Sequence, residues 1–150
     1  MKQEEINGFT KDEVKDLYRF ICMYEKGGFG FFYALEDVYR CHPQLVHILP
    51  LFLGNLELSK TGLREIQKVD LSTFKNKICF TKSKNKDKVL SFLSHLRNSI
   101  AHGLIFREDQ RIIIADYSTV KPTSFSARGA MDYNLFMELI NIINNNVNEL

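Results

Sequence analysis

The chain has 150 residues, enough for one domain with a single hydrophobic core, and we expect residues 1–150 to form that domain. Hydrophobic residues make up 45% and charged residues 25%, as in ordinary globular proteins, which excludes a disordered chain. The net charge is only +2, so overall charge does not require a nucleic-acid partner, and any argument for one must be local.

The cysteines, the N-terminus and the longest apolar run predict a cytoplasmic protein without a membrane partner. The chain has three cysteines, Cys22, Cys41 and Cys79. Their number is odd and their spacing does not fit a metal site, which is typical of reduced and mostly buried thiols. The N-terminus is polar and acidic and does not resemble a signal peptide. The apolar run over residues 45–53 is interrupted by His47 and Pro50 and is too short to span a bilayer.

The N-terminal part of the chain carries helix signals separated by a glycine-rich break. Thr10 and Glu13 have the spacing of a capping box, which predicts a helix over residues 11–24. Residues 27–30 contain three glycines. They predict a flexible connector rather than a phosphate-binding loop, because neither a preceding strand nor a GKS/T sequence accompanies them. Residues 31–41 predict a short helix with an aromatic face.

Residues 44–69 predict a long, largely helical stretch that Pro50 kinks or divides. His42 and His47 lie five positions apart with a proline between them. This proline argues against both imidazoles facing one side of a helix, so we expect no metal site there.

A lysine-rich segment follows at residues 75–88, with six lysines and one aspartate, a local charge of +5. Two interpretations are open: a solvated loop, or an electrostatic rim beside a phosphate-binding site. In the second interpretation the RNA-binding candidates are Lys82, Lys84, Lys86 and Lys88.

Residues 89–103 have the period of an amphipathic helix that Gly103 ends. Its apolar side carries Val89, Phe92, Leu93, Leu96 and Ile100. Its polar side carries short groups that donate, accept or exchange protons, namely Ser91, Ser94, His95, Asn98 and His102. A polar face without long charged side chains, apart from Arg97 at its border, indicates a surface that a partner or a substrate covers.

The remaining chain changes from strand to helix periodicity. Residues 104–107 and 111–117 predict a hairpin, and residues 119–128 predict a loop. Asp132 can cap a last helix, which we expect to run to about residue 147 and to fray at its asparagine-rich end. We therefore predict a mainly all-α fold, a helical bundle with one small β-hairpin between the polar-faced helix and the last helix.

The sequence from Arg97 to His102 matches the pattern R-N-x-x-x-H. This motif, at the end of an amphipathic helix in the second half of the chain, resembles the HEPN (higher eukaryotes and prokaryotes nucleotide-binding) superfamily. The stretch HLRNSIAHG, followed by a hairpin and a closing helix, is similar to small stand-alone bacterial members from abortive-infection and toxin–antitoxin settings. The resemblance implies a compact helical bundle and a composite active site in a homodimer.

The resemblance also implies a metal-independent endoribonuclease without a cofactor, which leaves a 2′,3′-cyclic phosphate on its RNA substrate, and a neutralising antitoxin as a further partner. Some HEPN domains are non-catalytic. One branch, paired with nucleotidyltransferase antitoxins, has a tyrosine where this chain has Leu104, so modification at that position is not expected.

The chemistry of the motif residues supports the same assignment. His102 can act as base or acid near neutral pH, Arg97 can bind phosphate oxygens with its planar guanidinium, and Asn98 can orient His102 or bind a phosphate. On a straight helix Asn98 and His102 are about 40° apart, but Arg97 and His102 are about 140° apart. A twofold dimer would bring two copies of each around one cleft.

Three further residues of this helix are candidates for supporting roles: Ser94, His95 and Ser99. A simple hydrogen-bonding role of His95 at an interface is the alternative to a catalytic one. Phe106 and Tyr117 could stack on bases only if they project into the cleft.

For the domain as a whole, the alternative is a catalytically silent HEPN-like dimer that binds RNA, a nucleotide or a partner protein. An enzyme should present Arg97 and His102 in an open, positively charged cleft, whereas a silent module should seal them or tie them to carboxylates.

Overall fold

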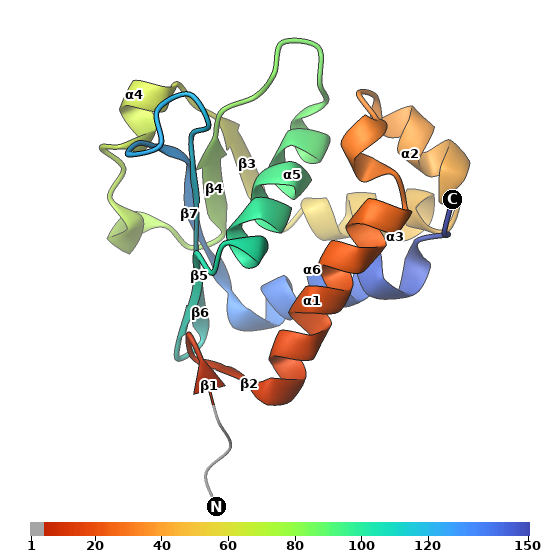
Figure 1. Cartoon of the computed structure of the whole chain (residues 1–150), viewed down its shortest axis with the longest axis horizontal. Coiled ribbons are helices and arrows are strands. Elements are labelled where there is room, and N and C mark those ends of the chain that lie inside the picture. The colour runs from red at the N-terminus through yellow and green to blue at the C-terminus, as the bar shows by residue number, and fades with distance from the viewer. Residues whose placement is uncertain (1–4) are drawn as a thin grey trace, which may run out of the picture.

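A five-stranded mixed sheet forms the centre of the computed structural model, which describes residues 5–150 (Figure 1). Its strands, in the spatial order β3-β4-β7-β6-β5, are β3 (Glu57–Lys60), β4 (Lys77–Phe80), β7 (Phe125–Asp132), β6 (Arg111–Tyr117) and β5 (Ile105–Glu108). Strands β3 and β4 are parallel, and the other neighbours are antiparallel. The prediction of a mainly all-α bundle was therefore wrong.

The helices lie on both sides of this sheet. Helix α5 (Lys88–Ala101) and helix α6 (Tyr133–Asn146) pack on one face, and α1 (Lys11–Lys26) packs against both of them from outside (Figure 1). The short helices α4 (Leu63–Ile66) and η2 (Leu71–Thr73) contact the sheet through β7. The remaining elements are β1 (Glu5–Ile6), β2 (Phe9–Thr10), η1 (Phe29–Phe31), α2 (Leu35–Cys41) and α3 (Leu45–Leu53).

Three strands occupy segments where the sequence predicts something else. Strand β3 interrupts the long helix predicted over residues 44–69, and β4 lies within the lysine-rich segment. Strand β7 begins inside the predicted loop over residues 119–128 and continues to Asp132, although its sequence FSARGAMD is poor in the β-branched residues that favour strands. Pairing on both sides, with β4 and β6, holds β7 in the sheet despite its low propensity.

Gly129 permits the close approach of β7 to β4. It pairs with Ile78, and a Cβ atom at Gly129 would lie 2.5 Å from the Lys77 carbonyl oxygen and 2.7 Å from the Ile78 Cα. These are backbone atoms that cannot move aside, so any side chain at this position would separate the two strands.

The predictions that depend on local signals were confirmed. Thr10 and Glu13 form the capping box of α1, and the Asp132 side chain accepts hydrogen bonds from the first turn of α6. Strands β5 and β6 form the predicted hairpin. Helix α6 extends to Asn146 through the asparagine-rich segment, where the buried Asn144 amide donates to the Asp16 carbonyl oxygen at 3.1 Å.

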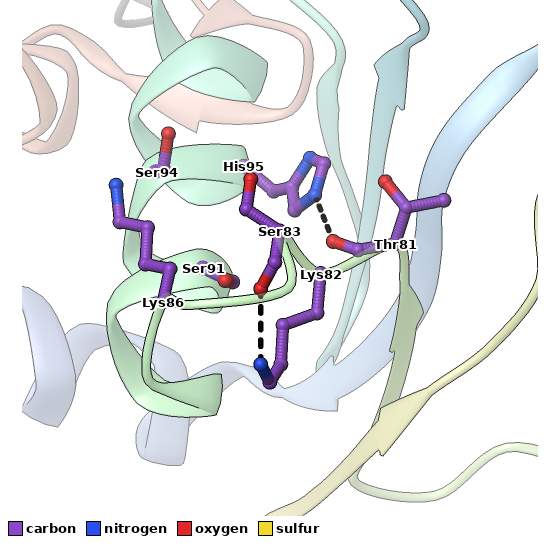
Figure 2. Close-up of a pocket in the computed structure, with 7 residues that line it drawn as sticks. All are labelled: Thr81, Lys82, Ser83, Lys86, Ser91, Ser94 and His95. Atoms are coloured by element: carbon purple, nitrogen blue, oxygen red, sulfur yellow. Dashed lines mark hydrogen bonds between the residues drawn. The ribbon is translucent and has the colours of Figure 1, made fainter. Parts of the chain in front are cut away.

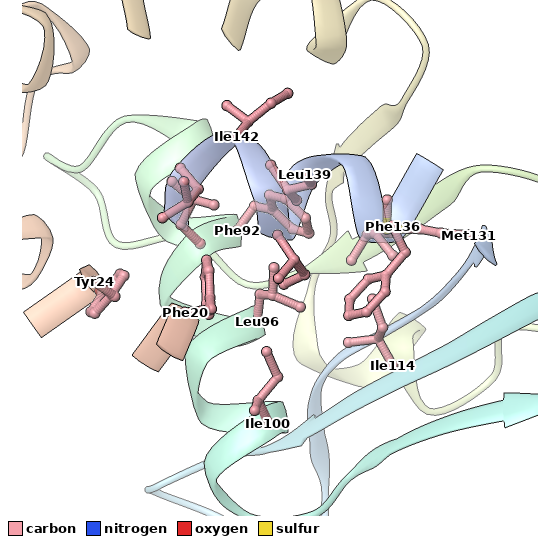
Figure 3. Packing of buried hydrophobic residues seen from close by; sticks show 14 of the residues in the cluster. Phe20, Tyr24, Phe92, Leu96, Ile100, Ile114, Met131, Phe136, Leu139 and Ile142 are labelled. Atoms are coloured by element: carbon pink, nitrogen blue, oxygen red, sulfur yellow. The ribbon is translucent and has the colours of Figure 1, made fainter. Parts of the chain in front are cut away.

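The apolar side of α5 forms the middle of the hydrophobic core. Phe92, Leu96 and Ile100 lie at 5% exposure or less and face apolar side chains of α1, α6 and the sheet (Figure 3). Burial of one such side chain stabilises the fold by about 1.5–3 kcal/mol. The core therefore fixes the rotation of α5 about its axis, and with it the residues that α5 presents to solvent. Within residues 5–150, no helix is long and apolar enough to cross a membrane.

Candidate functional site

The motif residues share one exposed stripe along α5. Beyond the first turn of α5, the half-buried or exposed positions other than His95 follow the helical spacing i, i+3, i+4, i+7, i+8, and we call them the motif stripe: Ser94, Arg97, Asn98, Ala101 and His102. The His95 side chain is only 15% exposed and points toward the sheet, where it meets Asp116. The core covers most of the rest of this helix. Arg97 therefore lies on the same surface as Asn98 and His102, although it is at the border of the polar side on the helical wheel.

Arg97 forms an ion pair with α1. Its Nε donates to Glu25 Oε1 at 2.9 Å, and Nη2 lies 2.8 Å from the same oxygen. Its third nitrogen, Nη1, donates to Asn98 Oδ1 at 3.3 Å. The Arg97 side chain is 30% exposed and that of Glu25 56%, so this pair lies at the surface, where an anion can compete with the carboxylate.

Asp116 of β6 connects the motif to the sheet. Its carboxylate is buried, with Oδ2 2.9 Å from His95 Nδ1 and 3.4 Å from the Asn98 Nδ2 that donates to it. The sequence analysis missed both Asp116 and Glu25. A signal for Asp116 exists in the sequence, because an aspartate inside the apolar run IIIADY is unfavourable in a strand unless it has a buried partner.

His95 uses both of its ring nitrogens inside the protein. Nδ1 faces Asp116, and Nε2 lies 2.9 Å from the Thr81 carbonyl oxygen. A ring protonated on both nitrogens can donate to both acceptors, whereas a neutral ring can donate to only one. Neither nitrogen is free to take a proton from a substrate, so His95 orients Asp116 and the adjoining loop. Ser99 is fully buried and donates to the His95 carbonyl oxygen at 2.8 Å, so its hydroxyl is directed away from the motif stripe.

His102 occupies the C-terminal cap of α5 and is exposed. The helix ends in a Schellman motif, in which Gly103 donates to the Ile100 carbonyl oxygen at 3.2 Å and Leu104 to the Ser99 carbonyl oxygen at 2.8 Å. Gly103 has φ of 69°, a left-handed conformation that favours glycine. This turn sets the position of His102 at the end of the stripe. The His102 backbone N–H donates to the Asn98 carbonyl oxygen at 2.9 Å, but among the described residues no hydrogen bond joins the His102 side chain to Arg97 or Asn98.

A polar pocket adjoins the other end of the stripe (Figure 2). We call it the lysine pocket; its volume is about 260 Å³, and its lining residues are Thr81, Lys82, Ser83, Lys86, Ser91, Ser94 and His95. Of the four lysine candidates, only Lys82 and Lys86 belong to it. Lys84 and Lys88 line a neighbouring hollow, together with Lys82 and Lys86 and with residues that precede α2.

Burial affects Lys86, which lines the lysine pocket, and Tyr24, which lies beside the pocket residue Ser94. Burial lowers the pKa of Lys86, because an ammonium group loses part of its hydration there. Ser94 lies beside the hydroxyl group of Tyr24. Burial raises the pKa of that phenol, and its hydrogen bond with Ser94 only partly opposes the rise.

The remaining candidates lie apart from the motif stripe. Tyr117 stacks on Phe125 with ring centroids 4.8 Å apart, and Phe106 lies on the edge strand β5, 40% exposed. His42 is a core residue whose Nε2 lies 2.7 Å from the Gly27 carbonyl oxygen, whereas His47 is exposed.

The three cysteines are free thiols, and Cys22 is exposed rather than buried as predicted. Within residues 5–150, no group of three or more histidine, cysteine, aspartate or glutamate side chains could hold a metal ion.

Comparisons of the chain with models of protein families, with curated proteins and with solved structures found no match.

Proposed function

We propose that this chain is a metal-independent endoribonuclease of the HEPN type, with its active site on the motif stripe of α5. The observation that carries the proposal is that Arg97, Asn98 and His102 all lie on one solvent-accessible stripe of a helix whose other sides are held by the core. A surface helix without a ligand would more often carry lysine and glutamate there. The resemblance of the R-N-x-x-x-H sequence supports the same assignment.

In this proposal RNA supplies the nucleophile, its own 2′-hydroxyl group. His102 takes the proton from that hydroxyl or gives one to the leaving 5′-oxygen. Arg97 binds the non-bridging phosphate oxygens and stabilises the charge that develops on them. Asn98, held by Asp116 at 3.4 Å, positions the phosphate or the Arg97 side chain. The products are a 2′,3′-cyclic phosphate and a 5′-hydroxyl end.

The proposal includes a homodimer. Along α5, Arg97 and His102 are about 7.5 Å apart, and in one copy Arg97 is turned toward Glu25 of α1. Two copies that pack about a twofold axis through the motif stripe would place two arginines and two histidines around one cleft, and two histidines could divide the roles of base and acid. The small side chains of Ser94 and Ala101 allow a second helix to approach closely.

The biological setting that fits such a nuclease is defence or growth control, with a neutralising antitoxin that covers the motif stripe. This part of the proposal depends on the family resemblance alone. It predicts that cleavage activity is toxic to the cell that produces the protein without its partner.

A second candidate function is a catalytically silent dimer that binds RNA or a partner protein. The Arg97–Glu25 ion pair favours it, because a motif arginine tied to a carboxylate is the arrangement expected of a binding module. The two candidates differ in whether an RNA phosphate displaces Glu25 and whether His102 then transfers a proton.

RNA cleavage in the presence of EDTA tests the proposal. Wild type should cleave RNA to cyclic-phosphate ends, and His102→Ala should lower the rate by about 10²- to 10⁴-fold, the usual contribution of a general acid or base. Arg97→Ala should also abolish most activity. His47→Ala is the matched control, because it removes an exposed histidine from α3.

Light scattering and thermal unfolding would establish that each variant keeps its dimer state and fold. Cleavage that survives both motif substitutions would reject the proposed residues. Full activity of a monomer would reject the composite site. If folded wild-type dimers bind RNA and do not cleave it, the silent module replaces the nuclease.

A further inference from the structure

We propose that the lysine pocket beside the N-terminal half of α5 binds a phosphoryl group, separately from the phosphate at the motif stripe. Lys82 and Lys86 supply positive charge, and the hydroxyl groups of Ser91 and Ser94 supply donors. None of the seven residues that line it is acidic. That combination of donors and cations suits an oxyanion and does not suit a cation.

Ser91 gives an independent indication of a missing ligand. The residue is 5% exposed, and its Oγ has no hydrogen-bond partner among the described residues. An unpaired buried hydroxyl lowers the stability of a fold by about 1–3 kcal/mol. A ligand oxygen that accepts a hydrogen bond from this hydroxyl would remove that penalty. Figure 2 shows this hydroxyl pointing from α5 toward the loop that carries Ser83.

The two lysines retain donors for a ligand. Lys82 Nζ donates to the carbonyl oxygens of Ser83 and Lys84 at 3.0 and 3.4 Å, which leaves the third of its three N–H bonds. Lys86 is partly desolvated by burial, and a nearby anion would compensate for the hydration that its ammonium group has lost. The loop backbone thus fixes the position of the Lys82 ammonium group, and a bound anion would stabilise the Lys86 ammonium group that burial disfavours.

The shape and lining of the pocket favour a sugar–phosphate group over a base. Apart from the His95 imidazole, whose nitrogens are both engaged, its lining contains no aromatic ring on which a base could stack. Ser94 and Asn98 are about 6 Å apart along the helix axis, so a strand with one phosphate at the motif stripe can place a neighbouring phosphate in the pocket. The identification of the ligand as RNA rests on the proposed function, whereas the phosphoryl site itself does not.

Titration of inorganic phosphate into the isotope-labelled full chain tests the site directly. At constant ionic strength, the backbone amide signals of Ser83, Ser91 and Ser94 should shift saturably in the NMR spectrum. Lys86→Gln and Ser91→Ala should each weaken this binding about tenfold, the value of one hydrogen bond to a charged group. Lys11→Ala, which removes an exposed lysine at the start of α1, should leave it unchanged.

Ser91→Ala should act in opposite directions on two properties. In the free protein it removes an unpaired hydroxyl, so the melting temperature should stay the same or rise, while phosphate affinity falls. The absence of saturable shifts, or equal affinity in wild type, Lys86→Gln and Ser91→Ala, would overturn the proposal and leave a water-filled hollow.

Two further ligands distinguish the source of the phosphoryl group. A 2′-O-methyl oligonucleotide, which cannot be cleaved because its nucleophile is blocked, should compete with phosphate and should lose affinity in Lys86→Gln. If only adenosine 5′-monophosphate competes, the site takes a free phosphomonoester, and the RNA assignment is overturned. If phosphate binds as expected but wild type cleaves no RNA, the proposed nuclease fails and the phosphoryl site stands.

Discussion

In the proposed nuclease, Glu25 competes with an RNA phosphate for Arg97, so removal of the Glu25 carboxylate should strengthen RNA binding. Both of the Arg97 contacts go to one oxygen of Glu25, at 2.9 and 2.8 Å. The Glu25 side chain is 56% exposed, so solvent screens the pair and its free energy is about 0.2–1 kcal/mol. An RNA phosphate that binds the guanidinium must first displace Glu25, so its binding free energy is reduced by that amount. Glu25→Gln should therefore raise the affinity for RNA by about 1.4- to 5-fold.

Fluorescence anisotropy with a labelled 2′-O-methyl oligonucleotide measures this effect without cleavage. Glu138→Gln is the matched control, because it removes an exposed carboxylate from α6 and changes the net charge equally. The gain should also disappear when Glu25→Gln is combined with Arg97→Ala, since a double-mutant cycle isolates the coupling between the two residues. Equal gains in Glu25→Gln and Glu138→Gln would refute the view that Arg97 binds phosphate.

Two further predictions concern the groups that hold α5 and α1 in place. Asp116→Ala should lower the free energy of unfolding, measured in urea, by about 1–3 kcal/mol, because it leaves His95 Nδ1 and the Asn98 amide without their shared buried acceptor. For Glu13, burial acts to raise the pKa, but hydrogen bonds, chiefly from Tyr133, and the charge of Arg107 lower it overall. A lowered carboxyl pKa stabilises the fold at neutral pH and loses that effect as pH falls through the folded pKa, so the stability difference between wild type and Glu13→Gln should shrink in acid.

The sequence predicts those elements whose signals are contiguous. The capping box of α1, the Asp132 cap of α6 and the β5–β6 hairpin each depend on residues a few positions apart, and all three are present. Strands β4 and β7 pair across about fifty residues of chain, and β7 has a glycine at its closest contact with β4. Strand propensity cannot detect such a segment, because its stability comes from neighbours that only the tertiary fold supplies.

The candidate site likewise has one part that the sequence predicts and another part that only the tertiary fold determines. Helical periodicity alone places Asn98 and His102 on one face. The partners that determine what these residues can do come from elsewhere: Glu25 lies 72 positions from Arg97, and Asp116 lies 18 positions from Asn98. No spacing rule connects these positions, so the sequence could not predict that the motif arginine is ion-paired or that His95 has no free nitrogen.

The prediction of an all-α fold was wrong, but this error has little effect on the functional proposal. A functional site depends on the element that presents it rather than on the class of the whole fold. Helix α5 carries the motif, and its apolar face is buried as its periodicity requires. The sheet takes the place of the helices expected behind α5, and it adds Asp116, a buried carboxylate that fixes Asn98 and His95. The backbone of a motif stripe held rigidly from behind need not reorganise when the stripe binds the proposed second copy or RNA strand, so only the Arg97 side chain has to leave Glu25. Such preorganisation is the condition for efficient electrostatic stabilisation of a transition state.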